Sequence, residues 1–183
     1  MISKMAIVIE VARELFSEKG YDNTSMADIC KKANVSKGLI YHHFSSKEEL
    51  LKVVYINTVE KMKGLGVGVS YSNCPKKTII EYIGVIIEQV KSHKVFFKTY
   101  LNNCIFQPST RKILDDLITD TTTTYLKKVR AVFDQLDNEN STVLSYLFIS
   151  KIDGIVLNYL TVFEEYPIDE VKKALIDEYK LLL

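Results

Sequence analysis

The segment from Thr24 to Leu50 constrains the fold more than any other part of the chain. Ser25 followed three residues later by Asp28 is a capping box, which satisfies free amides at the start of a helix. Asn34 suits a left-handed residue at the end of that helix, and Ser36 suits the cap of a second helix of about seven residues. So short a helix is not stable alone. Neighbours must hold it, as they hold the second helix of a helix-turn-helix that is displayed to DNA.

Apolar spacing and capping signals predict further helices on both sides of this segment. The N-terminal helices are expected at residues 3–19, 26–33, 37–43 and 47–63. Gly20 ends the first of them, and Ser46 with Glu49 forms a capping box at the start of the fourth. The stretch from Gly64 to Pro75 concentrates three glycines and a proline, which is typical of a loop or hinge.

The rest of the chain is also expected to be helical, at residues 76–93, 95–105, 109–136, 140–165 and 167–183. Residues 140–165 are apolar on well over one face, so we expect one side to meet the core and the other a partner subunit. The predicted fold is therefore all-α, with a three-helix DNA-binding domain followed by a larger helical domain. The predicted ranges are 1–46 for the helix-turn-helix domain, 47–63 for a connecting helix and 64–183 for a regulatory and dimerisation domain.

Composition agrees with a folded, helix-rich protein, because 47% of residues are hydrophobic and only three are proline. No run of about 18 uncharged apolar residues is present, so we expect no membrane span. The best candidate, Ile79 to Ile87, is short and is interrupted by Glu81. Charged residues throughout the first twenty argue against a signal peptide. The net charge of +1 neither supports nor excludes binding to nucleic acid.

The cysteines Cys30, Cys74 and Cys104 are odd in number and far apart, with no C-x-x-C pair. This is typical of reduced thiols in a cytoplasmic protein. No nucleophile–base pairing, metal-ligand spacing or phosphate-binding loop indicates an enzyme, a metal or a cofactor.

The chain resembles the TetR/AcrR family of transcriptional regulators over its first third. The matching positions are Leu15, Phe16, Gly20, Tyr21, Thr24, Ser25, Ile29, Ala33, Val35, Ser36, Gly38, Tyr41, Phe44, Lys47 and Leu50. Two positions depart from the commonest pattern: Cys30 replaces an alanine and Asn34 replaces a glycine. Cysteine is a small apolar residue and asparagine enters left-handed conformations at low cost, so both departures are compatible with the fold.

The resemblance implies roles for individual residues of the helix-turn-helix and the helix caps beside it. Phosphate contacts are expected from Thr24, Ser25, Tyr41, His43 and Lys47. Contacts to base edges or nearby backbone in the major groove are expected from Ser36, Lys37, Gly38 and His42. Any side chain at Gly38 would hold the helix away from DNA, whereas Ile40 and Phe44 are expected to anchor the helix to the core.

Other interpretations of these residues remain open from the sequence. His42 and His43 could be metal ligands, a general base or ordinary surface residues, but adjacent helical residues point about 100° apart and cannot readily share an ion. Lys37 and Lys47 could be solvated surface lysines.

The resemblance also implies a small lipophilic effector bound in the C-terminal domain. Aromatic residues could line its site, although aromatics at helical spacing more often fill a core. The ligand-binding candidates are Tyr82, Phe96, Tyr100, Asn103, Phe106, Tyr125, Tyr146 and Tyr159. Asn102, Asn103 and Gln107 could orient a ligand or cap a helix end before Pro108, and the sequence leaves both readings open.

The expected function is a homodimeric repressor that binds a near-palindromic DNA operator and is released by the effector. The dimer is expected to form through residues 140–165 and 167–183. One alternative is a DNA-binding protein of the same fold that has no small-molecule effector and is controlled by a partner protein. A more remote alternative is an enzyme.

Overall fold

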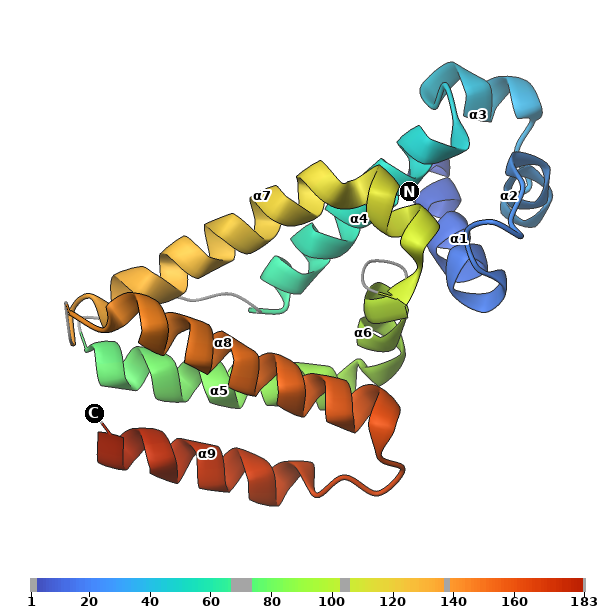
Figure 1. The fold of residues 1–183 in the computed structure, drawn as a ribbon. Coiled ribbons are helices and arrows are strands. Elements are labelled where there is room, and N and C mark those ends of the chain that lie inside the picture. The colour runs from blue at the N-terminus through green and yellow to red at the C-terminus, as the bar shows by residue number, and fades with distance from the viewer. Residues whose placement is uncertain (1–2, 67–73, 103–105, 137–138, 183) are drawn as a thin grey trace. The chain divides into compact units, whose positions relative to one another are not determined.

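The computed structural model describes residues 3–66, 74–102, 106–136 and 139–182. These residues form helices joined by short connections, and no strand occurs among them, which confirms the all-α prediction. Figure 1 shows the order of the helices along the chain. They are α1 (Lys4–Lys19), α2 (Met26–Ala33), α3 (Lys37–His43), α4 (Lys47–Gly64), α5 (Pro75–Ser92), α6 (Lys94–Leu101), α7 (Pro108–Phe133), α8 (Ser141–Leu157), the π-helical turn η2 (Asn158–Val162) and α9 (Ile168–Leu182).

The chain folds into two compact units, of which the first contains the described residues of Met1–Lys61 and Thr99–Ile118. Its core is built on α1 to α4, with side chains such as Phe16 fully buried. Leu114 and Ile118, from the first part of α7, belong to the same core. The N-terminal helices therefore share their apolar interior with residues from much later in the sequence.

The second unit contains the described residues of Met62–Lys98 and Thr119–Leu183. Helix α5 packs against α9 and α8, and its buried face includes Ile83 and Ile87. Phe148 of α8 lies at the centre of an aromatic cluster, with its ring within 6 Å of the ring centroids of Tyr82, Phe133 and Tyr179. The units divide α4, α6 and α7, so their limits differ from the predicted ranges 1–46, 47–63 and 64–183, which remain predictions. Most of the loop predicted from Gly64 to Pro75 lies outside the described residues.

The predicted capping box at α2 is confirmed on both sides. Ser25 Oγ accepts a hydrogen bond from the Asp28 N–H, and the Asp28 carboxylate accepts one from the Ser25 N–H. Asn34 has φ 52° and ψ 50°, the left-handed conformation expected at this helix end. Gly20 ends α1 at φ 81° and ψ 158°, a region that glycine adopts without a steric penalty.

The capping box predicted for α4 is only half correct. Ser46 Oγ accepts from the Glu49 N–H at 3.1 Å, as expected. The Glu49 carboxylate, however, accepts from the N–H and the hydroxyl of Ser45 rather than from the Ser46 N–H. These two bonds lower the pKa of Glu49. The carboxylate reaches one residue further back and fixes the chain before the cap.

The apolar helix predicted at 140–165 divides into α8 and the η2 turn, which ends at Val162. Within the described residues, Ser141–Val162 is long and apolar enough to cross a membrane by length and composition, with a mean hydropathy of 1.4. This segment contains Lys151 and Asp153, so it is not an uncharged apolar run, and the expectation of no membrane span stays a prediction. One side of the helix is buried through Phe148, Ile152 and Leu160, while the other leaves large apolar side chains exposed. Exposed apolar faces of this kind also occur at contacts between subunits.

Candidate nucleic-acid interface

Helix α3 is anchored by a few side chains and exposes the remainder. Ile40 is fully buried within it, and Phe44 at its end is also buried, which confirms both predicted anchors. Ser36 Oγ accepts from the Leu39 N–H at 3.2 Å and caps the helix. Six of the residues predicted to contact DNA are exposed on or beside it: Ser36, Lys37, Gly38, Tyr41, His42 and His43.

Gly38 has no packing role among the described residues, because a Cβ added there would meet none of their atoms within 4 Å outside its own helix backbone. Glycine within a helix costs roughly 0.5–1 kcal/mol relative to alanine. The fold therefore bears a small cost at this position without an internal reason for it. The expected reason is external, namely the close approach of another molecule.

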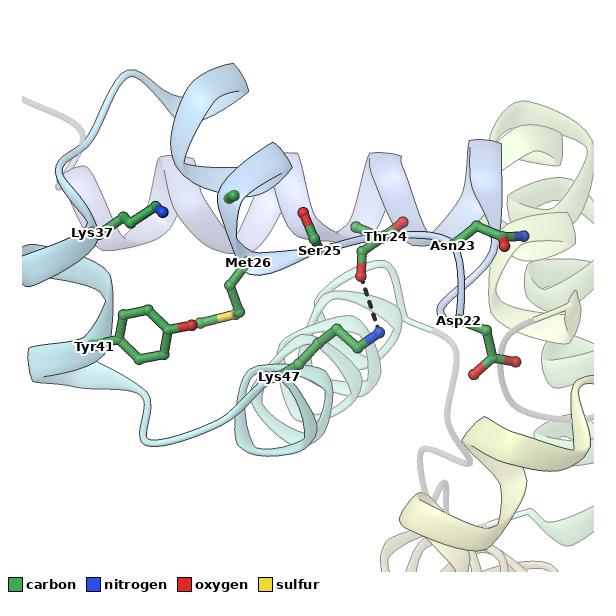
Figure 2. A pocket seen from close by; sticks show the side chains of 9 residues that line it. Asp22, Asn23, Thr24, Ser25, Met26, Lys37, Tyr41 and Lys47 are labelled. Atoms are coloured by element: carbon green, nitrogen blue, oxygen red, sulfur yellow. Dashed lines mark hydrogen bonds between the residues drawn. The ribbon is translucent and has the colours of Figure 1, made fainter.

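A groove of about 500 Å³ brings together five of the predicted DNA-contacting residues. Figure 2 shows that it lies between the start of α2, helix α3 and the start of α4. The residues that line this groove are Asp22, Asn23, Thr24, Ser25, Met26, Ala27, Lys37, Tyr41 and Lys47. Residues from three helices and one turn thus converge on a single concave surface.

Thr24 lines the groove, but its hydroxyl is not available to a partner molecule. The residue is only 1% exposed, and Oγ1 lies 2.8 Å from the Gly20 carbonyl oxygen and 3.2 Å from that of Leu15. Its N–H donates to the Tyr21 carbonyl oxygen. Thr24 therefore stabilises the turn before α2, and the structure does not offer its side chain for the predicted phosphate contact.

The Ser25 hydroxyl is also engaged within the chain. It donates to the Asp28 carboxylate at 2.6 Å and accepts from the Asp28 N–H at 3.1 Å. The hydroxyl and N–H of Ser25 lower the pKa of Asp28, so the carboxylate keeps its charge and holds the cap. The amides of Met26 and Ala27 have no described hydrogen-bond partner, as expected for the first turn of a helix.

Lys47 is the cation with the most contacts in the groove. Its Nζ donates to the carbonyl oxygens of Tyr21 at 2.9 Å and Thr24 at 3.0 Å, the second of which is drawn in Figure 2. It also lies 4.1 Å from the centroid of the Tyr21 ring. A lysine ammonium has three N–H donors, so one remains after these two bonds. Lys47 both stabilises the turn and retains a charge-assisted donor.

The other hydrogen-bond donors of the groove, Tyr41 and Lys37, have no described hydrogen-bond partner within the chain. Tyr41 is 53% exposed, and no hydrogen bond of its hydroxyl is described. Lys37 is exposed at the first position of α3. Together with Lys47 and the two amides of α2, they give the groove a positively charged, donor-rich surface. Such a surface is suited to a phosphate group.

The two adjacent histidines belong to no group of three or more potential metal-ligand side chains among the described residues. The rings of His42 and His43 are nearly perpendicular, at 79°, with centroids 5.1 Å apart. Both side chains are exposed near the end of α3. Their place on the same helix as Lys37 groups them with the candidate interface.

Four residues bear on this groove that the sequence did not predict to do so. Asp22 and Asn23 line it directly. Gln107 and Ser109 reach the turn before α2 from the region where α6 ends and α7 begins. Their contacts span more than 80 positions of sequence, and no local pattern predicts such a pairing. The side chain of Gln107 contacts Tyr21, which neither sequence-based reading of Gln107 had anticipated.

The candidate ligand-binding residues are divided between the two compact units. Tyr82, Phe96, Tyr125, Tyr146 and Tyr159 belong to the second unit. Tyr125 donates its hydroxyl hydrogen to Tyr82 at 2.7 Å, and burial raises the pKa of Tyr82 to about 12. The Lys94 ammonium lies 4.5 Å from the centroid of the Tyr159 ring. The side chain of Tyr146 is exposed.

The remaining ligand candidates lie elsewhere. Tyr100 belongs to the first unit, where it stacks on Tyr55, and Phe106 belongs to the same unit and is half-exposed. Asn103 lies outside the described residues. Among the described candidates, Tyr82 and Tyr125 are joined by a direct hydrogen bond.

Residues 8–54 match the family model described as bacterial regulatory proteins, tetR family. The HTH-type transcriptional regulator UidR of Escherichia coli is 43% identical over 54 residues, which cover 30% of this chain and 28% of UidR. The chain thus spans well under two thirds of the length of this curated relative. The match is confined to the helix-turn-helix region and the helices around it.

Solved structures extend the similarity to almost the whole chain. A transcriptional regulator of Aquifex aeolicus, described as belonging to the TerR/AcrR family, has a TM-score of 0.72 and 25% identity, covering 99% of this chain and all of that one. AibR, solved with isovaleryl coenzyme A and operator DNA, has a TM-score of 0.70 and 18% identity, covering 96% of this chain and 97% of that one. The helical arrangement of the second unit is therefore shared with regulators of this kind.

Proposed function

Since the chain belongs to the TetR family through its helix-turn-helix region, we propose that it is a sequence-specific DNA-binding repressor that acts as a homodimer. The observation that carries this proposal is the groove between α2, α3 and α4. It combines two lysines, a tyrosine hydroxyl and two helix N-terminal amides. The exposed face of α3 adjoins it with side chains that can hydrogen-bond to base edges.

The residues of this surface divide into two roles. Lys47, Tyr41 and the amides of Met26 and Ala27 bind phosphate, which positions the protein on DNA. Lys37 and His42, with Ser36 beside them, contact base edges in the major groove, and Gly38 permits the helix to approach them. His43 contacts the adjacent backbone.

A homodimer is supported by the exposed apolar face of α8. Val143 and Leu147 are more than half exposed on it, and Leu181 and Leu182 are exposed at the end of α9. An isolated chain in water gains nothing from exposing such side chains, whereas a second copy of the helix would bury them. A two-fold dimer reads a near-palindromic operator with half-sites about one helical turn, or a multiple of it, apart.

The proposed function includes release from DNA by a small lipophilic effector bound in the second unit. Its support is the fold shared with AibR, which was solved with an acyl coenzyme A, and the aromatic cluster around Phe148 in the second unit. An effector can release DNA only by binding better to a conformation that binds DNA less well. The protein would act in the cytoplasm, where its operator is.

The experiment that tests the proposal is selection of duplexes from a randomised DNA library with the wild-type protein and its variants. A near-palindromic consensus is expected. Lys37→Ala and His42→Ala should change the consensus, while Tyr41→Ala should retain it and weaken binding by about 1–3 kcal/mol. Failure to recover any enriched sequence would contradict sequence-specific binding. The effector is tested by melting curves with acyl coenzyme A compounds, which should raise the melting temperature more than free coenzyme A does.

A further inference from the structure

The region where α6 ends and α7 begins contacts the turn that leads into the DNA-binding groove. The Tyr21 N–H donates to Gln107 Oε1 over a long 3.5 Å, and Ser109 Oγ donates to Asp22 Oδ2 at 2.9 Å. All four residues belong to the first compact unit. The contact joins two segments that are 86 and 87 positions apart in sequence.

The backbone of Gly20 shows how closely this contact is fitted. Its φ of 81° is one that side-chain-bearing residues rarely adopt, and a Cβ added there would lie 3.2 Å from Gln107 Nε2. A third hydrogen bond joins the hydroxyls of Ser17 in α1 and Thr99 in α6 at 2.7 Å, and either hydroxyl could be the donor. The turn is thus held on one side by these residues and on the other by Lys47.

The Asp22 carboxylate places a negative charge in a groove that also contains two lysines. Among the described residues that line the groove, it is the only carboxylate, and the cations are Lys37 and Lys47. A free carboxylate there would repel a DNA phosphate and compete with it for the ammonium groups. The Ser109 hydroxyl satisfies part of the hydrogen-bonding capacity of this carboxylate and fixes its position.

We propose that Ser109 and Gln107 are positioning residues for DNA binding, which hold the turn before α2 and keep the Asp22 carboxylate engaged away from the bound phosphate. This inference rests on the proposed function, because it assigns a role in the same groove. It adds to the DNA-binding apparatus a segment that lies outside the helix-turn-helix sequence. Ser109 acts through Asp22 and need not touch DNA.

The test is a double-mutant cycle on DNA affinity, with a duplex selected by the wild-type protein and an unrelated duplex of equal length. Ser109→Ala should weaken binding to both duplexes by roughly two- to fivefold at about 50 mM salt, the range of one exposed charge interaction. Asp22→Asn should strengthen binding by a similar factor. The loss caused by Ser109→Ala should disappear in the Asp22→Asn background. Both effects should shrink at about 200 mM salt.

Three variants serve as controls. Ser109→Thr keeps the hydroxyl and should restore wild-type affinity. Asp116→Asn removes an exposed charge from α7, the helix of Ser109, at a position outside the groove. It should not reproduce the gain in DNA affinity expected of Asp22→Asn. Ser92→Ala removes an exposed hydroxyl at the end of α5 and should leave affinity unchanged.

The outcomes separate this inference from the proposed function. Equal losses from Ser109→Ala in both backgrounds, or no loss in either, would overturn the positioning role while leaving DNA binding intact. A wild-type protein that binds neither duplex would overturn both. Melting curves of each variant show whether a loss of affinity reflects unfolding, and the Asp22→Asn gain remains a test if Ser109→Ala unfolds.

Discussion

Lys47 holds Tyr21 by two different interactions, since its Nζ donates to the Tyr21 carbonyl oxygen at 2.9 Å and lies 4.1 Å from the centroid of the same residue's ring. A charge-assisted hydrogen bond and a cation–π contact thus meet at one ammonium. Lys47 begins α4, whereas Tyr21 directly follows the end of α1. The residue proposed to bind phosphate is therefore also one that stabilises the unit.

This double role predicts a difference between the two lysines of the groove. Lys47→Met should weaken DNA binding and also lower the free energy of unfolding by about 1–3 kcal/mol. The reason is that the partly buried carbonyl oxygens of Tyr21 and Thr24 lose a charged hydrogen-bond donor. Lys37→Met should change DNA binding alone, since Lys37 is exposed and no bond of its ammonium is described. Denaturant titration and DNA titration of both variants measure the difference. Equal stability of the two variants would contradict the role given to Lys47.

Gly38 predicts opposite changes in stability and in binding. Gly38→Ala should raise the free energy of unfolding by roughly 0.5–1 kcal/mol, because alanine favours the helix and the space is open. The same variant should bind DNA less well, because the added methyl group meets the DNA. Gly84→Ala, on α5, is the matched control: its Cβ also meets open space, so it should stabilise without loss of binding. A Gly38→Ala variant with undiminished affinity would remove the proposed reason for this glycine.

The cap at Ser25 predicts a pH dependence of stability. The Ser25 hydroxyl and N–H lower the pKa of Asp28. The Asp28 carboxylate is therefore protonated less readily in the folded protein than in the unfolded chain. The stabilisation is then present above the unfolded-state pKa, about 3.9, and is lost as the pH falls through the lower folded-state value. Asp28→Ala should therefore be less stable than wild type at neutral pH.

Denaturant titrations at neutral pH and at about pH 3 measure this effect, with the gap between the two proteins expected to narrow in acid. Asp116→Ala, which removes an exposed carboxylate that makes no described bond, is the control and should lose less stability at neutral pH. A gap that is the same at both pH values would show that the Asp28 carboxylate does not hold the cap through its charge.

The exposed face of α8 predicts the oligomeric state. Leu147→Glu should convert the dimer into a monomer, because a charge would have to be buried in an apolar contact. The side chain is 52% exposed in the single chain, so the fold of each subunit should survive. Ile56→Glu, a comparable change on α4 where the side chain is 48% exposed, is the control and should remain dimeric. Light scattering measures both masses, and a monomeric wild-type protein would refute the interface.

Local signals in the sequence predicted the helix-turn-helix well. Ser25, Asp28, Asn34 and Ser36 each act on a neighbour within five positions, so their hydrogen bonds depend on little beyond the local chain. The Glu49 carboxylate shows the limit of such reasoning, since two serines stood in sequence within its reach and the bond formed to Ser45 rather than Ser46.

The hydrogen-bond partners of individual side chains and the contacts between distant segments could not be predicted from such local signals. The sequence assigned phosphate contacts to Thr24 and Ser25, but packing of the turn engages the first hydroxyl and the capping box the second. The pairing of Gln107 with Tyr21 depends on how α6 and α7 return to the N-terminal helices, which no periodicity encodes. The π-helical turn after α8 likewise follows a segment whose apolar pattern continues without a break.

The share of Leu114 and Ile118 in the N-terminal core bears on how chimeric regulators could be made from this protein. An exchange of C-terminal segments by cutting the chain after α4 would take these two side chains away and expose the apolar surface they cover. A graft that carries Thr99–Ile118 along with the N-terminal helices would keep that interior closed. For protein engineering, the transferable part is a discontinuous set of segments rather than an N-terminal fragment.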